Sequence, residues 1–156
     1  MLTKGRFLVA SLLILAVQGL FGCSIPSTTS SISNPIVGAW LVQDPNAPFP
    51  YHMYVFNADG TMQQANPDAG DSHGSDSDGK GIWVANGTRI EGKWVEVIAD
   101  RATHQFAGRL EISYELTVSG DTYTATETVR SYDAAGSLAA SPATPEKLIG
   151  KRVTLP

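Results

Sequence analysis

The chain has 156 residues, which suffices for one domain of ordinary size and leaves little room for a second core. Fifteen acidic residues outnumber eleven basic ones, and this balance argues against nucleic acid as a partner, because binding to phosphates needs clustered Lys and Arg. The single cysteine excludes a disulfide within the chain.

Residues 1–22 predict an export signal that is cut off. Lys4 and Arg6 give a positive start, and the stretch from Phe7 to Leu20 is almost wholly apolar. This stretch of roughly 15 residues is shorter than the ~20 that a membrane-spanning helix needs. It ends in Leu20-Phe21-Gly22-Cys23, which resembles a lipobox, the site where bacterial lipoproteins are cleaved and acylated on the cysteine. The alternative is an unmodified, buried Cys23 in a signal that is retained.

The lipobox resemblance implies acyl chains such as palmitate on Cys23 and a lipid-anchored protein of the bacterial cell envelope, at the outer membrane or facing the periplasm. Residues 23–35 are rich in Ser, Thr and Pro and carry no charge, which predicts a flexible linker. Residues 36–156 then form the folded domain. Without Lys4 and Arg6 its charge is more negative still, so we expect the lipid rather than a basic face to hold it at the membrane.

The domain is predicted to be all-β, because apolar and polar residues alternate and Gly, Asn and Asp turn signals separate the alternating segments. The expected strands lie near residues 36–43, 51–57, 61–65, 80–85, 88–99, 106–119, 122–132 and 148–154. Connections such as Ala58-Asp59-Gly60 are short enough to join neighbouring strands. Eight strands of this kind favour an antiparallel up-and-down barrel.

Two hairpins fix the expected register. If Gly120-Asp121 is a two-residue turn, counting outward places Val118, Leu116, Tyr114 and Ile112 opposite Tyr123, Ala125, Glu127 and Val129, all on the apolar face. If Asn86-Gly87 is the turn of the other hairpin, Trp83 lies opposite Ile90.

Gly38-Ala39-Trp40, at the start of the first strand, resembles the Gly-x-Trp that opens lipocalin-like, or calycin, barrels. In that family the Trp plugs one end of the barrel and a basic residue near the last strand covers it, a place that Arg152 could fill by a cation–π contact. The resemblance implies that the barrel binds a small, largely apolar ligand. The alternative is that Trp40 is an ordinary core aromatic of a β-sandwich.

Glu127 is the main candidate for chemistry, since the expected register turns it inward beside Tyr114. Buried carboxylates are rare unless they are paired. Glu96 continues the same inward face unless a bulge at Gly92 reverses it. Two inward carboxylates beside a tyrosine suit acid–base work or the polar head of a ligand. The alternatives are a hydrated interior or a register shifted by one residue.

No metal or cofactor is predicted. Residues 66–81 contain Asp76-Ser77-Asp78-Gly79, but the positions of an EF-hand loop are not matched, so a solvated, mobile loop is expected. The three histidines, His52, His73 and His104, lack the spacing of zinc ligands.

Three functions remain open. The leading one is a non-enzymatic barrel that binds a small lipophilic molecule in a cavity lined by Trp83, Leu110, Ile112, Tyr114, Leu116, Tyr123 and Glu127. The second is a cofactor-independent cyclase or isomerase with Glu127 as base, Tyr114 orienting it and Glu96 as its partner. The third is a structural or interaction protein whose barrel is filled by side chains.

Overall fold

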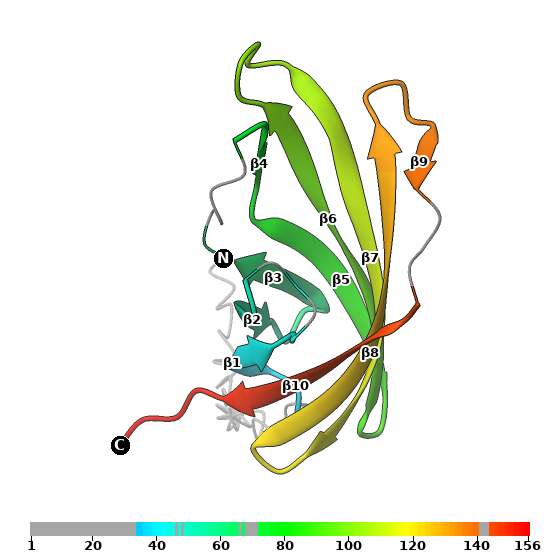
Figure 1. Cartoon of the computed structure of the whole chain (residues 1–156). Coiled ribbons are helices and arrows are strands. Elements are labelled where there is room, and N and C mark those ends of the chain that lie inside the picture. The colour runs from blue at the N-terminus through cyan, green and yellow to red at the C-terminus, as the bar shows by residue number, and fades with distance from the viewer. Residues whose placement is uncertain (1–33, 46, 48, 66, 68–71, 141–143) are drawn as a thin grey trace, which may run out of the picture. The chain divides into compact units, whose positions relative to one another are not determined.

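A computed structural model describes residues 34–156 apart from positions 46, 48, 66, 68–71 and 141–143; the predicted signal and Cys23 lie outside this part. The described chain forms one sheet of ten β-strands (Figure 1). They are β1 (Gly38–Gln43), β2 (Tyr51–Phe56), β3 (Thr61–Ala65), β4 (Gly74–Asp76), β5 (Gly79–Asn86), β6 (Arg89–Asp100), β7 (Phe106–Ser119), β8 (Thr122–Asp133), β9 (Leu138–Ala140) and β10 (Glu146–Arg152). Within the described ranges no helix has the length and apolar character needed to cross a bilayer.

Eight of these strands close into an antiparallel barrel, as the sequence predicts. The strand order is β1-β2-β3-β5-β6-β7-β8, and β10 closes the ring by pairing with β8 on one side and β1 on the other. Within the ring, each strand thus lies beside the ring strand that follows it in the chain, and the pairing of β10 with β1 closes the circle. β4 and β9 stand outside the ring and pair with β6 and β8 respectively.

The β7–β8 hairpin has the predicted register. Tyr114 lies opposite Glu127 and Leu116 opposite Ala125. Gly120 adopts a φ of 59°, which a residue with a side chain rarely takes and which the first position of a type I′ or II′ turn requires. Burial alternates along β7, where every second residue from Ile112 to Val118 is buried.

The predicted pairing of Trp83 with Ile90 is wrong. Trp83 lies opposite Gly92, and Ile90 lies opposite Ala85. The turn is formed one residue later than predicted, with Gly87 at a φ of 63° and Thr88 following it. This choice places the glycine, rather than an asparagine, at the first turn position, where φ is positive. The shift is two residues in register, so both side chains still point inward and are buried.

The expectation for the acidic segment is corrected, whereas the expectation that Glu96 faces inward on β6 is confirmed. Gly74–Asp76 is not a solvated loop, because it forms β4 and pairs with the end of β6. The only irregularity in the β6–β7 pairing lies between Ile98 and Ala99, not at Gly92. Glu96 therefore keeps the inward orientation that uninterrupted alternation gives it.

The barrel interior is packed with large side chains. Phe56 contacts the rings of Trp83, Tyr114 and Tyr123 edge-on, with ring centroids 6.2–6.5 Å apart. Glycines on neighbouring strands make room for these rings: a Cβ on Gly150 would lie 2.1 Å from the Tyr123 ring, and a Cβ on Gly92 would lie 2.2 Å from the Tyr114 hydroxyl. The side chains predicted to line a cavity thus mostly fill the interior.

Strands β6, β7 and β8 continue well past the ends of β1, β2 and β3 (Figure 1). At this open end their inward side chains are no longer fully covered. Ile98, Leu110 and Val129 are only partly buried, although Leu110 and Val129 pack against the core below them. We call these three residues the apolar wall. Buried polar side chains adjoin it: Glu96 lies opposite Leu110, and Glu127 precedes Val129 on the inward face of β8.

Candidate functional site

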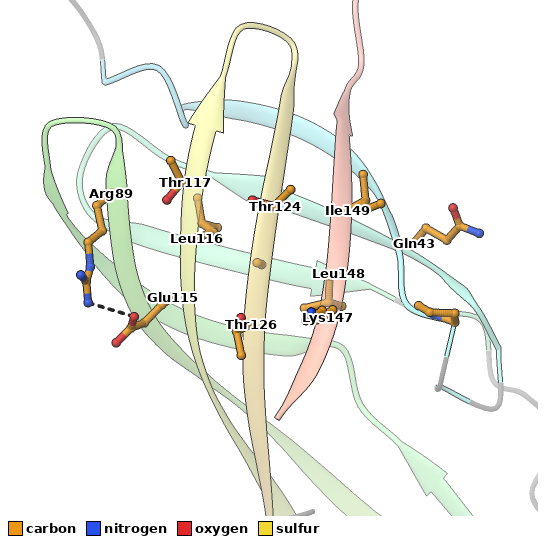
Figure 2. Close-up of a pocket in the computed structure, with 12 residues that line it drawn as sticks. Gln43, Arg89, Glu115, Leu116, Thr117, Thr124, Thr126, Lys147, Leu148 and Ile149 are labelled. Carbon is orange, nitrogen blue, oxygen red and sulfur yellow. Dashed lines mark hydrogen bonds and ion pairs between the residues drawn. The ribbon is translucent and has the colours of Figure 1, made fainter. Parts of the chain in front are cut away.

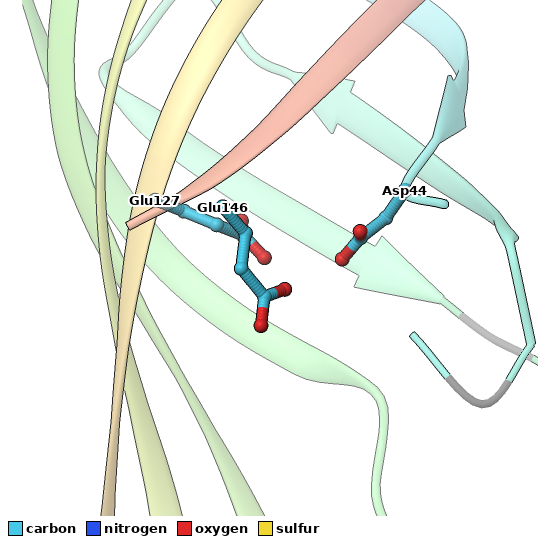
Figure 3. Close-up of side chains that lie close together, drawn as sticks. All are labelled: Asp44, Glu127 and Glu146. Carbon is cyan, nitrogen blue, oxygen red and sulfur yellow. The ribbon is translucent and has the colours of Figure 1, made fainter. Parts of the chain in front are cut away.

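Three carboxyl groups converge inside the barrel near its open end (Figure 3). Asp44 follows the last residue of β1, Glu127 lies in β8, and Glu146 is the first residue of β10, directly opposite Glu127. One carboxylate oxygen from each lies within 4.8 Å of the others. We call these residues the carboxyl cluster. Barrel closure creates it, since β10 joins β8 to β1.

Glu127 lies inside the barrel, as its register predicts, and only 5% of its surface is exposed. The Tyr54 hydroxyl donates a hydrogen bond to Glu127 Oε2 at 3.5 Å. Burial, followed by the charges of Asp44 and Glu146, raises the pKa of Glu127 to about 8. A carboxyl with this pKa is mostly protonated at pH 7, which suits a hydrogen-bond donor or general acid better than the base that the sequence suggested.

Asp44 and Glu146 interact directly. Burial, the charge of Asp44 and a hydrogen bond between the two side chains raise the pKa of the Glu146 carboxyl. Asp44 is 3% exposed and its backbone N–H donates to Pro50 O, which fixes the end of β1 against the start of β2.

Glu96 is also inside, with 3% of its surface exposed, but it stands apart from the carboxyl cluster. Burial raises its pKa to about 7, and the charges of Asp76 and Asp78 add to this effect. It lies near enough to Glu127 to raise the pKa of that carboxyl slightly. Its Oε1 has no hydrogen-bond partner in the described part of the chain.

A polar row that the sequence reading missed lies on β2, β3 and β5. Gln64 Oε1 accepts a hydrogen bond from Gly79 N at 2.9 Å, and Gln64 Nε2 lies 3.4 Å from His52 Nδ1. Burial lowers the pKa of His52. Period-two alternation does place His52 and Gln64 inward with Tyr54. The strands are short and mix polar with apolar residues, so this alternation is hard to recognise in the sequence.

Tyr114 lies opposite Glu127, as predicted, but its hydroxyl does not donate to that carboxyl; the Tyr54 hydroxyl does. The Tyr114 ring lies over Gly92, and its hydroxyl has no partner among the described residues. Burial raises the pKa of Tyr114. The remaining predicted lining residues belong to the core: Trp83, Ile112, Leu116 and Tyr123 are buried and only Leu110 is partly open.

A cavity of about 760 Å³ lies on the outer face of the barrel, not inside it (Figure 2). Outward side chains of β7, β8 and β10 line it, among them Thr117, Thr124 and Lys147, and the Arg89–Glu115 ion pair stands at its side. Most of its lining residues are exposed, although the buried Leu116, Ala125 and Leu148 also border it. The buried polar groups described above have no part in it.

No protein-family model, curated protein or solved structure matches this chain. The resemblance to lipocalin-like barrels therefore remains a prediction as far as family is concerned. Its geometric expectation for Trp40 is met: Arg152 lies opposite Trp40, and its guanidinium carbon stands 4.2 Å from the indole centroid. Arg152 also donates to Val37 O at 2.9 Å and pairs with Asp121, which fastens this end of the barrel.

Proposed function

We propose that this domain is a binding barrel for a small lipophilic molecule and that the molecule lies at the open end of the barrel. The centre of the barrel is occupied by aromatic side chains, whereas the open end combines an apolar wall with buried polar groups. A ligand with an apolar body and a polar end matches both surfaces.

The observation that carries the proposal is a set of buried polar atoms without hydrogen-bond partners in the described chain. They are His52 Nε2, Trp94 Nε1, Glu96 Oε1, Tyr114 Oη and Tyr123 Oη. All belong to inward-facing residues. An unpaired buried polar atom costs about 1–3 kcal/mol, and native domains hold only a few, so such a set favours a ligand or ordered water that completes it.

The apolar wall supports the same position. Glu96 and Leu110 are directly opposite one another on β6 and β7, so an apolar and a polar inward group adjoin at the open end. Ile98 and Val129 flank them and are partly exposed. Burying this partly open area on a ligand would be favourable by roughly 25 cal/mol per Å².

The test is native mass spectrometry of residues 33–156 after gentle purification, together with titration of the fluorescent lipophile N-phenyl-1-naphthylamine. We expect a co-purifying small molecule or saturable emission. Leu110→Asp should abolish it. Val97→Asp, an outward position that is 50% exposed on β6, should not. No bound molecule and no saturable emission would instead favour a filled barrel with a structural or interaction role.

We further propose that the protein reaches the cell envelope as a lipoprotein anchored through Cys23. The support is the export signal and lipobox-like ending described from the sequence. Cys23→Ser should release the protein from membranes in fractionation while leaving its circular dichroism unchanged. Processed Cys23→Ser protein that stays membrane-bound at high salt would contradict the anchor.

A further inference from the structure

The carboxyl cluster poses an electrostatic problem. Asp44, Glu127 and Glu146 bring three acidic groups to within 4.8 Å of one another, two of them almost completely removed from water. No cationic side chain lies within 4.0 Å of Glu127 or Glu146 among the described residues. At Glu127 and Glu146, protons or a bound cation can offset the negative charge.

The geometry suits a cation with oxygen ligands. Calcium is coordinated by oxygens at about 2.3–2.6 Å, so two ligands on opposite sides of the ion are about 5 Å apart and adjacent ligands are closer. The spacing within the cluster falls in this range. Pairing of Glu127, in the middle of β8, with Glu146, the first residue of β10, places these two side chains together, and the Asp44–Pro50 backbone bond fixes the third at the end of β1.

Two tyrosine hydroxyl groups lie beside the carboxyl cluster. The Tyr123 hydroxyl, on a residue that is 1% exposed, has no partner in the described chain. Tyr123 and Glu127 lie on the same inward face of β8, where only the small side chain of Ala125 comes between them along the strand. Tyr54 Oη lies 3.5 Å from Glu127 Oε2. Both hydroxyl oxygens can supplement carboxylate ligands.

We propose that Asp44, Glu127 and Glu146 form a binding site for a divalent cation of the calcium type. Three carboxylates leave one net negative charge when such an ion binds, which removes most of the repulsion. Protons compete for the same oxygens, so binding must release them. The cation would take the oxygens of the carboxyl cluster, whereas the apolar body of the proposed lipophilic ligand lies on the apolar wall, so each can be tested without the other.

The test uses terbium(III) as the probe, added to the full chain in a nonionic detergent. Energy transfer from Tyr54 should give sensitised emission that saturates at one ion per chain and that calcium reverses. Lowering the pH from 7.0 to 5.5 should weaken the apparent affinity at least tenfold. Glu127→Gln should weaken it at least tenfold, and so should Glu146→Gln, which lies nearer the surface and threatens folding less.

Matched controls separate this site from other acidic groups. Glu115→Gln, on the outer face of β7, and Asp78→Asn, beside β5, should leave the titration unchanged. Emission that does not saturate below 1 mM, or that persists in both Glu127→Gln and Glu146→Gln with native circular dichroism, would overturn the proposal and leave a cluster that holds protons only. Neither result depends on whether N-phenyl-1-naphthylamine binds.

Discussion

Glu96 provides a direct test of the buried charges, because replacing it by Gln should make the domain more stable at high pH. Its pKa rises from 4.5 to about 7 on folding. The folded state therefore retains a proton that the unfolded chain has released over this interval. The stability that this proton confers is complete below pH 4.5 and is lost as the pH rises through 7.

The magnitude follows from the displacement of the pKa. At 1.36 kcal/mol per pKa unit, moving from 4.5 to about 7 corresponds to about 3 kcal/mol between pH 4.5 and pH 8. Gln resembles the protonated carboxyl in shape and charge. Glu96→Gln should thus change stability little at pH 4.5 and raise the free energy of unfolding by about 2–3 kcal/mol at pH 8.

The assay is urea unfolding of residues 33–156 at pH 4.5, 6 and 8, followed by tryptophan fluorescence, with EDTA present to keep the carboxyl cluster free of cations. Glu91→Gln is the control, since Glu91 lies on the same strand with its side chain 56% exposed and paired with Arg89. It should shift stability by less than about 0.5 kcal/mol at each pH. Equal behaviour of Glu96→Gln and Glu91→Gln at pH 8 would refute the reasoning.

Three further outcomes are expected in the same assay. Ile112→Ala should lower the free energy of unfolding by about 2–5 kcal/mol, because it leaves a cavity in the core. Ser113→Ala, on the exposed face of β7, should lower it by less than about 0.5 kcal/mol. Equal losses from the two variants would contradict a single buried face of β7. Gly150→Ala should lower the free energy of unfolding by about 1–3 kcal/mol, since the new methyl group displaces the Tyr123 ring. An unchanged urea midpoint would contradict that close approach. Arg152→Ala should cost about 1–3 kcal/mol through loss of the indole contact and its hydrogen bonds, and neutrality would show that this end closes without it.

The fold could be predicted because residues close together in the sequence determine each strand and each hairpin. Alternation along residues 106–118 and a glycine at the turn set the strand, its inward face and its register at once. The Asn86-Gly87 hairpin shows where this local information ends. A turn that begins at Asn86 and one that begins at Gly87 leave the same side chains inward, so the alternation of apolar residues could not distinguish the two registers. β4 and β9 have three residues each, too few for any alternation to stand out.

The candidate site was only half predictable. Glu127 and Glu96 were found because they sit in long, regular strands. Asp44 and Glu146 lie just beyond or at the ends of theirs, and Tyr54 comes from a strand far away in the chain. Their meeting depends on ring closure, which no local pattern records. Predicting their positions required the tilt and stagger of the whole barrel.

Ring closure also bears on how the chain folds. From β1 to β8, each ring strand pairs with the next ring strand in the chain. The seam between β1 and β10 instead brings together groups such as Val37 and Arg152, which are separated by 115 positions. Loop-closure entropy opposes such a contact until the intervening hairpins have shortened the effective loop. We therefore expect the seam to form last and to open first, so that its amide hydrogens exchange earlier than those of the β6–β7 and β7–β8 hairpins.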